Sequence, residues 1–239
     1  MTLVTAYDYP TGRLLDEAGV DIVLVGDSLG MVVLGFPDTT HVTLDHMLHH
    51  VEATARGVKN ALLVGDMPIH SYDTVEQAVQ SAKKLFLAGA DAVKLEGGAA
   101  QAGNIRAIVE AGIPVVGHIG LLPQKVLEEG GYKIKGKSSA EEEALVRDVE
   151  AVAEAGACAV VVEGVTPHAA RQVTVHSSIP TLGIGSGSHT CDGDVVVIHD
   201  LVGAFPWFIP AFVKPRADVA GSMTAAVKEW MEDCYTEPG

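Results

Sequence analysis

The stretch IVLVGDSLG, residues 22–30, joins a short apolar run to an abrupt polar end. Runs of Ile, Val and Leu this short, closed by Gly, are typical of strands buried on both faces of a parallel sheet. We therefore expect Asp27 and Ser28 where this strand leaves the sheet. The same order recurs in LLVGDMP, AVKLEGG and AVVVEGV, whose acidic residues are Asp66, Glu96 and Glu163. Four carboxylates at strand ends point to a shared role.

Eight strand-like runs can be counted along the 239 residues, with helical segments between them. The helical periodicity is clearest in residues 74–90 and 138–157. Thr74 and Ser139 are predicted to cap these two helices, and Gly89 and Gly156 to end them. The runs are LVTAY (3–7), DIVLVGD (21–27), ALLVGDM (61–67), AVKLEG (92–97), IPVVGHIG (113–120), AVVVEGV (159–165), PTLGIGSG (180–187) and FIPAFVK (208–214).

Eight βα units in a chain of this length predict an α/β protein with a single (β/α)8 TIM barrel, spanning residues 1–239 as one domain. A doubly wound open sheet is the alternative, since counting strands does not separate the two. Polar residues end nearly every run, which favours the barrel, because ligands of an open sheet gather at one switch point. Residues 121–139 are the least regular stretch and are long enough for a lid or specificity loop.

Composition excludes several classes of partner. The formal net charge is -15 and no basic run is present, so neither nucleic acid nor an anionic membrane is an expected partner. The three cysteines are widely spaced and odd in number, which indicates neither a disulfide framework nor a zinc site. No apolar stretch approaches a membrane span of about 20 residues, and the first residues do not resemble a signal peptide. We expect a cytoplasmic protein with small-molecule substrates.

Asp27, Asp66 and Glu96 follow three successive strands, which are neighbours in a barrel. Three unpaired carboxylates held close together repel one another, and a divalent cation removes that conflict. A ligand set made only of oxygen atoms favours Mg2+ over zinc. Lys94 lies two residues before Glu96, so its side chain faces the same way and can offset a substrate carboxylate. Ser28 adds a hydroxyl and a backbone amide suited to an anion.

Glu163 lies near the end of the strand-like run at 159–165, across the predicted mouth from the three acids. This position suits a base that moves a proton on a substrate held by the metal. The alternative is that each acid simply caps the helix that follows it. Recurrence on four strands, with Lys94 facing inward, favours the site. His118 in GHIG ends the strand at 113–120 and is a candidate supporting residue beside the site.

Two further patterns are weaker. GIGSG, residues 183–187, is either a phosphate-binding turn or a plain tight turn, because no basic residue follows it closely. His46, His49 and His50 have helical spacing, yet their segment has the pattern of an amphipathic outer helix rather than a metal site.

Six motifs together resemble one family, ketopantoate hydroxymethyltransferase, also called 3-methyl-2-oxobutanoate hydroxymethyltransferase. They are TAYDY, VGDSLGM, VKLEGG, GHIGLLPQ, GGYKIKGK and GIGSG. The resemblance implies a barrel of the phosphoenolpyruvate/pyruvate-type superfamily and one Mg2+ per subunit. It also implies transfer of a hydroxymethyl group from 5,10-methylenetetrahydrofolate, as co-substrate, to 3-methyl-2-oxobutanoate in pantothenate biosynthesis. A homo-oligomer, often a decamer, is a further implication.

The resemblance also implies roles for individual residues. Asp27 and Asp66 resemble metal ligands that also contact the keto acid, and Ser28 resembles a second contact to it. Lys94 and Glu96 resemble the substrate lysine and an acid close to the metal, and Glu163 the catalytic base.

Two alternatives stay open at this point. A related metal-dependent barrel could act on another 2-oxo acid without folate, and it would share the three acids. A non-catalytic barrel kept as a binding or assembly subunit is the other alternative. Turnover that requires methylenetetrahydrofolate would argue against the folate-free enzyme. Exchange of the substrate C3 proton in deuterated water would argue against the non-catalytic barrel.

Overall fold

The computed structural model describes residues 1–236 and shows a closed barrel of eight parallel strands, joined in the order β1 to β8. Each strand lies beside the next strand of the chain and parallel to it, so a crossover connects each pair. The predicted (β/α)8 barrel is confirmed, and the open sheet is wrong. The strands are β1 (Thr2–Thr5), β2 (Ile22–Val25), β3 (Leu62–Asp66), β4 (Ala92–Glu96), β5 (Val115–Gly120), β6 (Ala159–Glu163), β7 (Thr181–Ile184) and β8 (Gly193–Val196).

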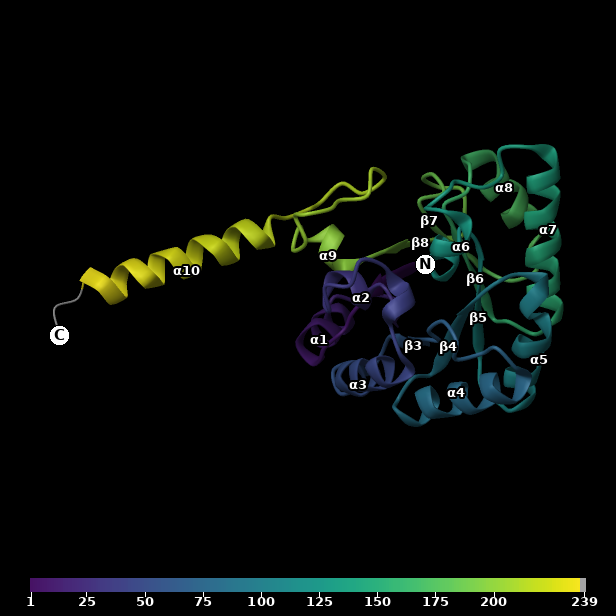
Figure 1. Cartoon of the computed structure of the whole chain (residues 1–239), viewed down its shortest axis with the longest axis horizontal. Coiled ribbons are helices and arrows are strands. Elements are labelled where there is room, and N and C mark those ends of the chain that lie inside the picture. Colours follow the sequence, from purple (N-terminus) through teal and green to yellow (C-terminus); the bar gives the residue numbers. More distant parts are fainter. Residues whose placement is uncertain (237–239) are drawn as a thin grey trace. The chain divides into compact units, whose positions relative to one another are not determined.

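Helices connect the strands and lie around the outside of the barrel (Figure 1). Thr74 caps α4 by accepting a hydrogen bond from the amide of Gln77, as predicted. Gly89 and Gly156 follow α4 and α7 with φ of 111° and 96°, a conformation that glycine adopts without strain. The helices up to β8 are α1 (Tyr9–Glu17), α2 (Leu29–Val32), α3 (Leu44–Ala55), α4 (Val75–Leu87), α5 (Ala102–Glu110), α6 (Val126–Glu129), α7 (Ser139–Glu154) and α8 (Pro167–His176), with 3-10 turns η1 (Thr39–His41), η2 (Ala99–Gln101) and η3 (Pro123–Lys125).

The cap of α7 differs from the prediction by one residue. The hydroxyl of Ser138 accepts a hydrogen bond from the amide of Glu141 at 3.3 Å, and Ser139 is the first residue of the helix. Two adjacent serines satisfy the preference for a capping residue equally well. Sequence spacing therefore did not separate them.

The eighth strand is also misplaced in the sequence analysis. Residues 208–214, FIPAFVK, form no strand and contain one turn at 211–212, and β8 is instead the short run at Gly193–Val196. Pro210 has no N–H to give to a strand ladder. Gly193 fits because a Cβ there would lie 2.4 Å from the carbonyl oxygen of Met1, so β8 passes very close to the start of the chain. The amide of Asp194 donates to this same carbonyl at 3.1 Å.

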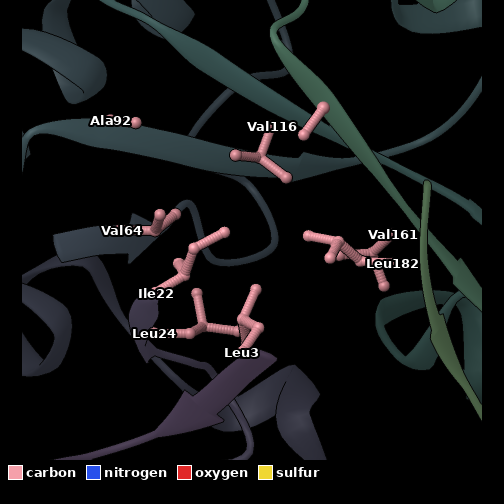
Figure 2. Packing of buried hydrophobic residues seen from close by; sticks show 9 residues of the cluster. Leu3, Ile22, Leu24, Val64, Ala92, Val116, Val161 and Leu182 are labelled. Carbon is pink, nitrogen blue, oxygen red and sulfur yellow. The ribbon is translucent and has the colours of Figure 1, made fainter. Parts of the chain in front are cut away.

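The inner face of the barrel has an apolar floor. Figure 2 shows side chains from several strands meeting there. Both faces of β2 are buried, since Val23 and Val25 on its outer face have no exposed surface. This explains why the strands read as continuous apolar runs rather than alternating ones. The floor consists of Leu3, Ile22, Leu24, Val64, Ala92, Val116, Ala159, Val161 and Leu182.

The inward face changes from apolar to polar towards the carboxyl ends of the strands. On β4, Ala92 is part of the floor, and Lys94 and Glu96 follow it on the same face because strand side chains alternate. On β3, Val64 is followed in the same way by Asp66. The barrel therefore buries its polar groups in one layer above the floor.

The chain divides into two compact units, and the second begins at Val196. It contains α9 (Ile198–Leu201) and α10 (Val219–Thr236), and no residue of α10 is buried. No helix within residues 1–236 is long and apolar enough to cross a membrane. One domain over 1–239 stays a prediction, and residues 237–239 lie outside the described part of the chain.

Asp16, near the end of α1, ties this helix to the loop before β3. One carboxylate oxygen accepts the backbone amides of Asn60 and Ala61, both at 2.8 Å. The other accepts the side-chain amide of Asn60 at 2.9 Å. The backbone amide bonds of Ala61 and Asn60 lower the pKa of Asp16 to about 2. These hydrogen bonds favour the ionised carboxyl group. Their contribution to the stability of the fold therefore depends on pH.

Asp16→Ala is expected to lower the free energy of unfolding by about 2 kcal/mol at pH 7, because two partly buried backbone amides lose their acceptor. The stabilisation is present above the ordinary carboxyl pKa and is lost as the pH falls towards the folded value of about 2. Thermal unfolding should therefore show a smaller gap between wild type and variant at pH 3 than at pH 7. Asp16→Asn, which keeps one acceptor, is the matched control and should lose less. Equal gaps at both pH values would contradict a charged role.

Candidate active site

The strand ends bring Asp27, Asp66, Glu96 and Lys94 together inside the barrel mouth. The register of β3 and β4 pairs Asp66 with Lys94, and Lys94 Nζ lies 2.8 Å from Asp66 Oδ1. The amide of Asp27 donates to Asp66 Oδ2 at 3.1 Å. None of the four residues is more than 5% exposed. The ammonium of Lys94 is thus the one positive charge among these three buried acids.

This imbalance of charge changes the pKa values. Burial, and then the charge of Asp27, raise the pKa of Asp66 to about 7, although Lys94 opposes the shift. Burial and the charge of Asp27 also raise the pKa of Glu96 well above its ordinary value. Burial works against the charge of Lys94, but Asp66 and Glu96 outweigh it and raise the pKa of the ammonium. Lys94 is therefore a fixed positive charge among acids that resist full ionisation.

Glu163 and His118 form a second pair beside the cluster. His118 Nε2 lies 3.2 Å from Glu163 Oε2, and His118 Nδ1 lies 3.2 Å from Lys94 Nζ. Burial, and then the charge of Lys94, lower the pKa of His118, so the neutral ring is favoured. An ammonium can only donate, so Nδ1 accepts from Lys94 and Nε2 carries the proton of the neutral ring on the side that contacts Glu163. The side chain of Glu163 is 24% exposed, so it faces the open mouth.

Gly120 sets the backbone beside Glu163. It pairs with Glu163 across β5 and β6 and has a φ of 96°. A Cβ at Gly120 would lie 2.3 Å from the Glu163 carbonyl oxygen, which also accepts the amide of Leu121 at 2.8 Å. Only glycine fits this close approach.

Gln124 and Tyr72 also belong to the cluster and were missed by the sequence analysis. Gln124 Nε2 donates to Asp27 Oδ2 at 2.8 Å, and the backbone amide of Gln124 donates to Glu96 Oε2 at 3.1 Å. The Tyr72 hydroxyl donates to Gln124 Oε1 at 2.5 Å. Gln124 ends the motif GHIGLLPQ, which was the one available signal, but a neutral amide in a loop suggests no chemistry by itself.

The capping alternative is wrong for all four strand-end acids. The helices after β3 and β6 are capped by Thr74 and Thr166. Ser28 holds the capping position of α2, and the helix after β4 has no side-chain cap. The acids are instead held by the hydrogen bonds and ion pairs of the cluster. Ser28 Oγ lies 2.9 Å from the Tyr7 hydroxyl, close to the strand end that carries Asp27.

The acidic cluster has the donor chemistry that Mg2+ prefers, all oxygen and negatively charged. Glu96 Oε1 is buried and has no hydrogen-bond partner, so it is free to accept a cation. Within residues 1–236, no three His, Cys, Asp or Glu side chains are arranged as a ready metal site. Gln124 engages only Oδ2 of Asp27, whereas both oxygens of Asp66 are engaged, by Lys94 and by the amide of Asp27. The residues therefore fit Mg2+ in chemistry, and binding it would require Asp66 to reorient.

The two weaker sequence patterns have structural explanations. His46, His49 and His50 lie on α3, the predicted outer helix, and His50 Nδ1 lies 2.6 Å from the Tyr7 carbonyl oxygen. In GIGSG, the Ser186 hydroxyl donates to the Val162 carbonyl at 2.6 Å, which ties this turn to β6.

The sequence matches the family described as "Ketopantoate hydroxymethyltransferase" over residues 1–238. The chain belongs to this family. The 3-methyl-2-oxobutanoate hydroxymethyltransferase of Ignicoccus hospitalis is 50% identical over 234 residues, which cover 98% of this chain and 88% of that protein. The protein of the same description from Moorella thermoacetica is 50% identical over 235 residues, 98% of this chain and 87% of its own. The resemblance seen in the motifs is confirmed, and this member of the ketopantoate hydroxymethyltransferase family is an enzyme and a transferase.

Solved structures agree on the fold of this ketopantoate hydroxymethyltransferase family member. Phosphoenolpyruvate phosphomutase from Streptomyces platensis subsp. rosaceus has a TM-score of 0.69 at 18% identity, covering 96% of this chain and 83% of that one. 2,3-Dimethylmalate lyase, described as a PEP mutase/isocitrate lyase superfamily member, has a TM-score of 0.64 at 18% identity, covering 99% and 83%. These likenesses show the barrel fold.

In metal-free protein, Asp66 should make stability fall as the pH rises. Its folded pKa of about 7 lies above the ordinary 3.8, so the folded state holds the proton more tightly and loses this advantage as the pH rises through 7. Asp66→Asn removes this titration. The melting temperature of Asp66→Asn relative to wild type should therefore rise between pH 5 and pH 8 in the presence of EDTA. Asp45→Asn, on the exposed surface of α3, is the control, and parallel pH curves for wild type and Asp66→Asn would contradict the expectation.

Proposed function

We propose that the chain transfers a hydroxymethyl group from 5,10-methylenetetrahydrofolate to 3-methyl-2-oxobutanoate, giving 2-dehydropantoate for pantothenate biosynthesis. One observation carries this proposal within the family. A partly exposed carboxylate, Glu163, stands beside a buried cluster of three acids and a lysine, and a neutral histidine fixes its orientation. This arrangement suits removal of a proton next to a carbonyl group.

The keto acid is proposed to bind over the cluster. Lys94 supplies the positive charge that faces its carboxylate, and Ser28 supplies a hydroxyl at the rim of the mouth. Asp27, Asp66 and Glu96 would hold one Mg2+, and Asp27 and Asp66 would also border the substrate. When bound, Mg2+ supplies positive charge that stabilises the enolate as the substrate C3 proton leaves.

Glu163 is the proposed base. It accepts the C3 proton, and the electrons of the broken C–H bond form the enolate. His118 Nε2 contacts Glu163 Oε2 at 3.2 Å and so borders this oxygen, and Lys94 keeps the ring in this tautomer through Nδ1. His118 thus acts as a positioning residue. Water replaces both folate nitrogens at the methylene carbon, so two C–N bonds break, tetrahydrofolate leaves with two N–H protons, and the carbon becomes formaldehyde. The enolate carbon then bonds to this aldehyde carbon, and the aldehyde oxygen takes the proton held by Glu163 and becomes the hydroxyl group.

The setting of the reaction is also part of the proposal. The three cysteines, Cys158, Cys191 and Cys234, are free thiols, as expected for a protein of the cytoplasm. Assembly as a homo-oligomer, and as a decamer in particular, is proposed from the family alone.

Asp27→Asn should weaken Mg2+ binding by about 10-fold or more, because an amide replaces a charged oxygen ligand of a hard cation. Isothermal calorimetry of metal-free protein measures the change directly. Asp45→Asn, a surface change of the same kind on α3, should bind Mg2+ as the wild type does. Equal affinity in wild type and Asp27→Asn would refute the ligand assignment.

Glu163→Gln should lower kcat by about 100-fold to 10,000-fold, the usual contribution of a general base. Exchange of the C3 proton in deuterated water, followed by NMR with Mg2+ present and folate absent, should fall in parallel. Binding of Mg2+ and keto acid should be retained, because Gln keeps the shape of the side chain. A variant that exchanges the proton at the wild-type rate but makes no product would show that Glu163 acts later, and His118 would become the candidate base.

Turnover and C3 exchange in the wild type separate the two alternative functions. Turnover of the keto acid without methylenetetrahydrofolate would favour a folate-free barrel enzyme. Absence of C3 exchange in the wild type, with Mg2+ present, would favour a non-catalytic barrel.

A further inference from the structure

Gln124 is the most connected neutral side chain of the site. It is 4% exposed, and its amide nitrogen donates to Asp27 Oδ2 at 2.8 Å and to the Met67 carbonyl oxygen at 3.1 Å. Its amide oxygen accepts the Tyr72 hydroxyl at 2.5 Å. Its backbone amide donates to Glu96 Oε2 at 3.1 Å. The residue follows β5 in η3, yet it reaches acids from the ends of β2 and β4.

The orientation of this amide is fixed by what surrounds it. A carboxylate and a carbonyl oxygen can only accept, so the NH2 group must face Asp27 and Met67. The oxygen then faces Tyr72, whose hydroxyl must donate. Burial raises the pKa of Tyr72, with the charge of Glu96 adding to the shift, so its proton is kept. Reversing the amide would set two acceptors against each other.

Tyr72 is itself held in place. Its side chain is buried, and its carbonyl oxygen accepts the side-chain amide of Asn104 from α5 at 2.8 Å. The chain of contacts therefore runs from Asn104 through Tyr72 and Gln124 to Asp27. The link from Gln124 leaves Asp27 Oδ1 outside this bond and, through the backbone, leaves Glu96 Oε1 unpartnered.

We infer that Gln124, locked by Tyr72, is the positioning residue that fixes Asp27 and Glu96 with one oxygen each turned to the cation. This rests on the proposed function, since it assigns a role towards the proposed Mg2+. Neither residue need touch the substrate. Hydrogen bonds that orient metal-binding carboxylates in this way typically change metal affinity or activity by about 10-fold to 100-fold when they are lost.

Gln124→Met tests the inference because it keeps the length of the side chain and removes both polar atoms. Calorimetry on metal-free protein should show a Mg2+ dissociation constant about 10-fold to 100-fold above the wild-type value. Activity at low Mg2+ should fall, and saturating Mg2+ should restore kcat, which a general loss of structure would not allow. Gln77→Met is the matched control, because its amide bonds only to the loop before α4.

Tyr72→Phe is a milder variant that keeps the ring and removes the hydroxyl, so it serves if Gln124→Met fails to fold. It should weaken Mg2+ binding in the same direction by a smaller factor. In the double variant, affinity should equal that of Gln124→Met alone, because the hydroxyl acts only through the amide. If the losses of Mg2+ affinity in the two single variants multiplied in the double variant, Tyr72 would not act through Gln124.

The outcomes separate the inference from the function on which it rests. Wild-type protein that binds no Mg2+ would overturn the proposed metal, and the inference with it. Wild-type protein that binds Mg2+, together with unchanged or tighter binding in Gln124→Met, would overturn the inference alone. Weaker binding in Gln124→Met and Tyr72→Phe, with normal binding in Gln77→Met, supports it.

Discussion

The ion pair of Lys94 and Asp66 inside the barrel is the interaction on which the site depends. A buried ammonium is stable only where opposite charge offsets its loss of hydration, and Asp66 lies 2.8 Å away with Glu96 and Asp27 close by. The acids in turn have only this one positive charge among them. Their excess of negative charge makes the layer suited to a cation. A bound cation would then attract an anionic substrate.

The ion pair is possible because the barrel divides its interior into layers. Side chains alternate along a strand, so every second residue of β4 faces inward, and Ala92 in the floor is followed by Lys94 and Glu96. The apolar floor excludes water from below. Register across the strands then sets the neighbours, since Asp66 pairs with Lys94 and Glu96 with His118. The closed sheet thus serves as a rigid support for groups that repel one another.

Lys94 also connects the acidic cluster to Glu163, the proposed base. Its ammonium contacts both Asp66 Oδ1 and His118 Nδ1, and the histidine contacts Glu163 through its other nitrogen. One lysine thereby fixes the tautomer of the ring. The partly exposed carboxylate at the mouth and the buried acids are connected through Lys94 and His118.

The sequence by itself located the first seven strands, favoured the barrel and indicated the family, because short apolar runs ending in acids and the six motifs are local patterns. The alternation rule also placed Lys94 and Glu96 on one face. Only the tertiary structure decided that β8 lies at Gly193–Val196, because that strand depends on a close approach to Met1 from the other end of the chain. Gln124 and Tyr72 were likewise decided by the fold. A neutral amide acquires its role from the groups that surround it, and those groups come from residues far apart in the sequence.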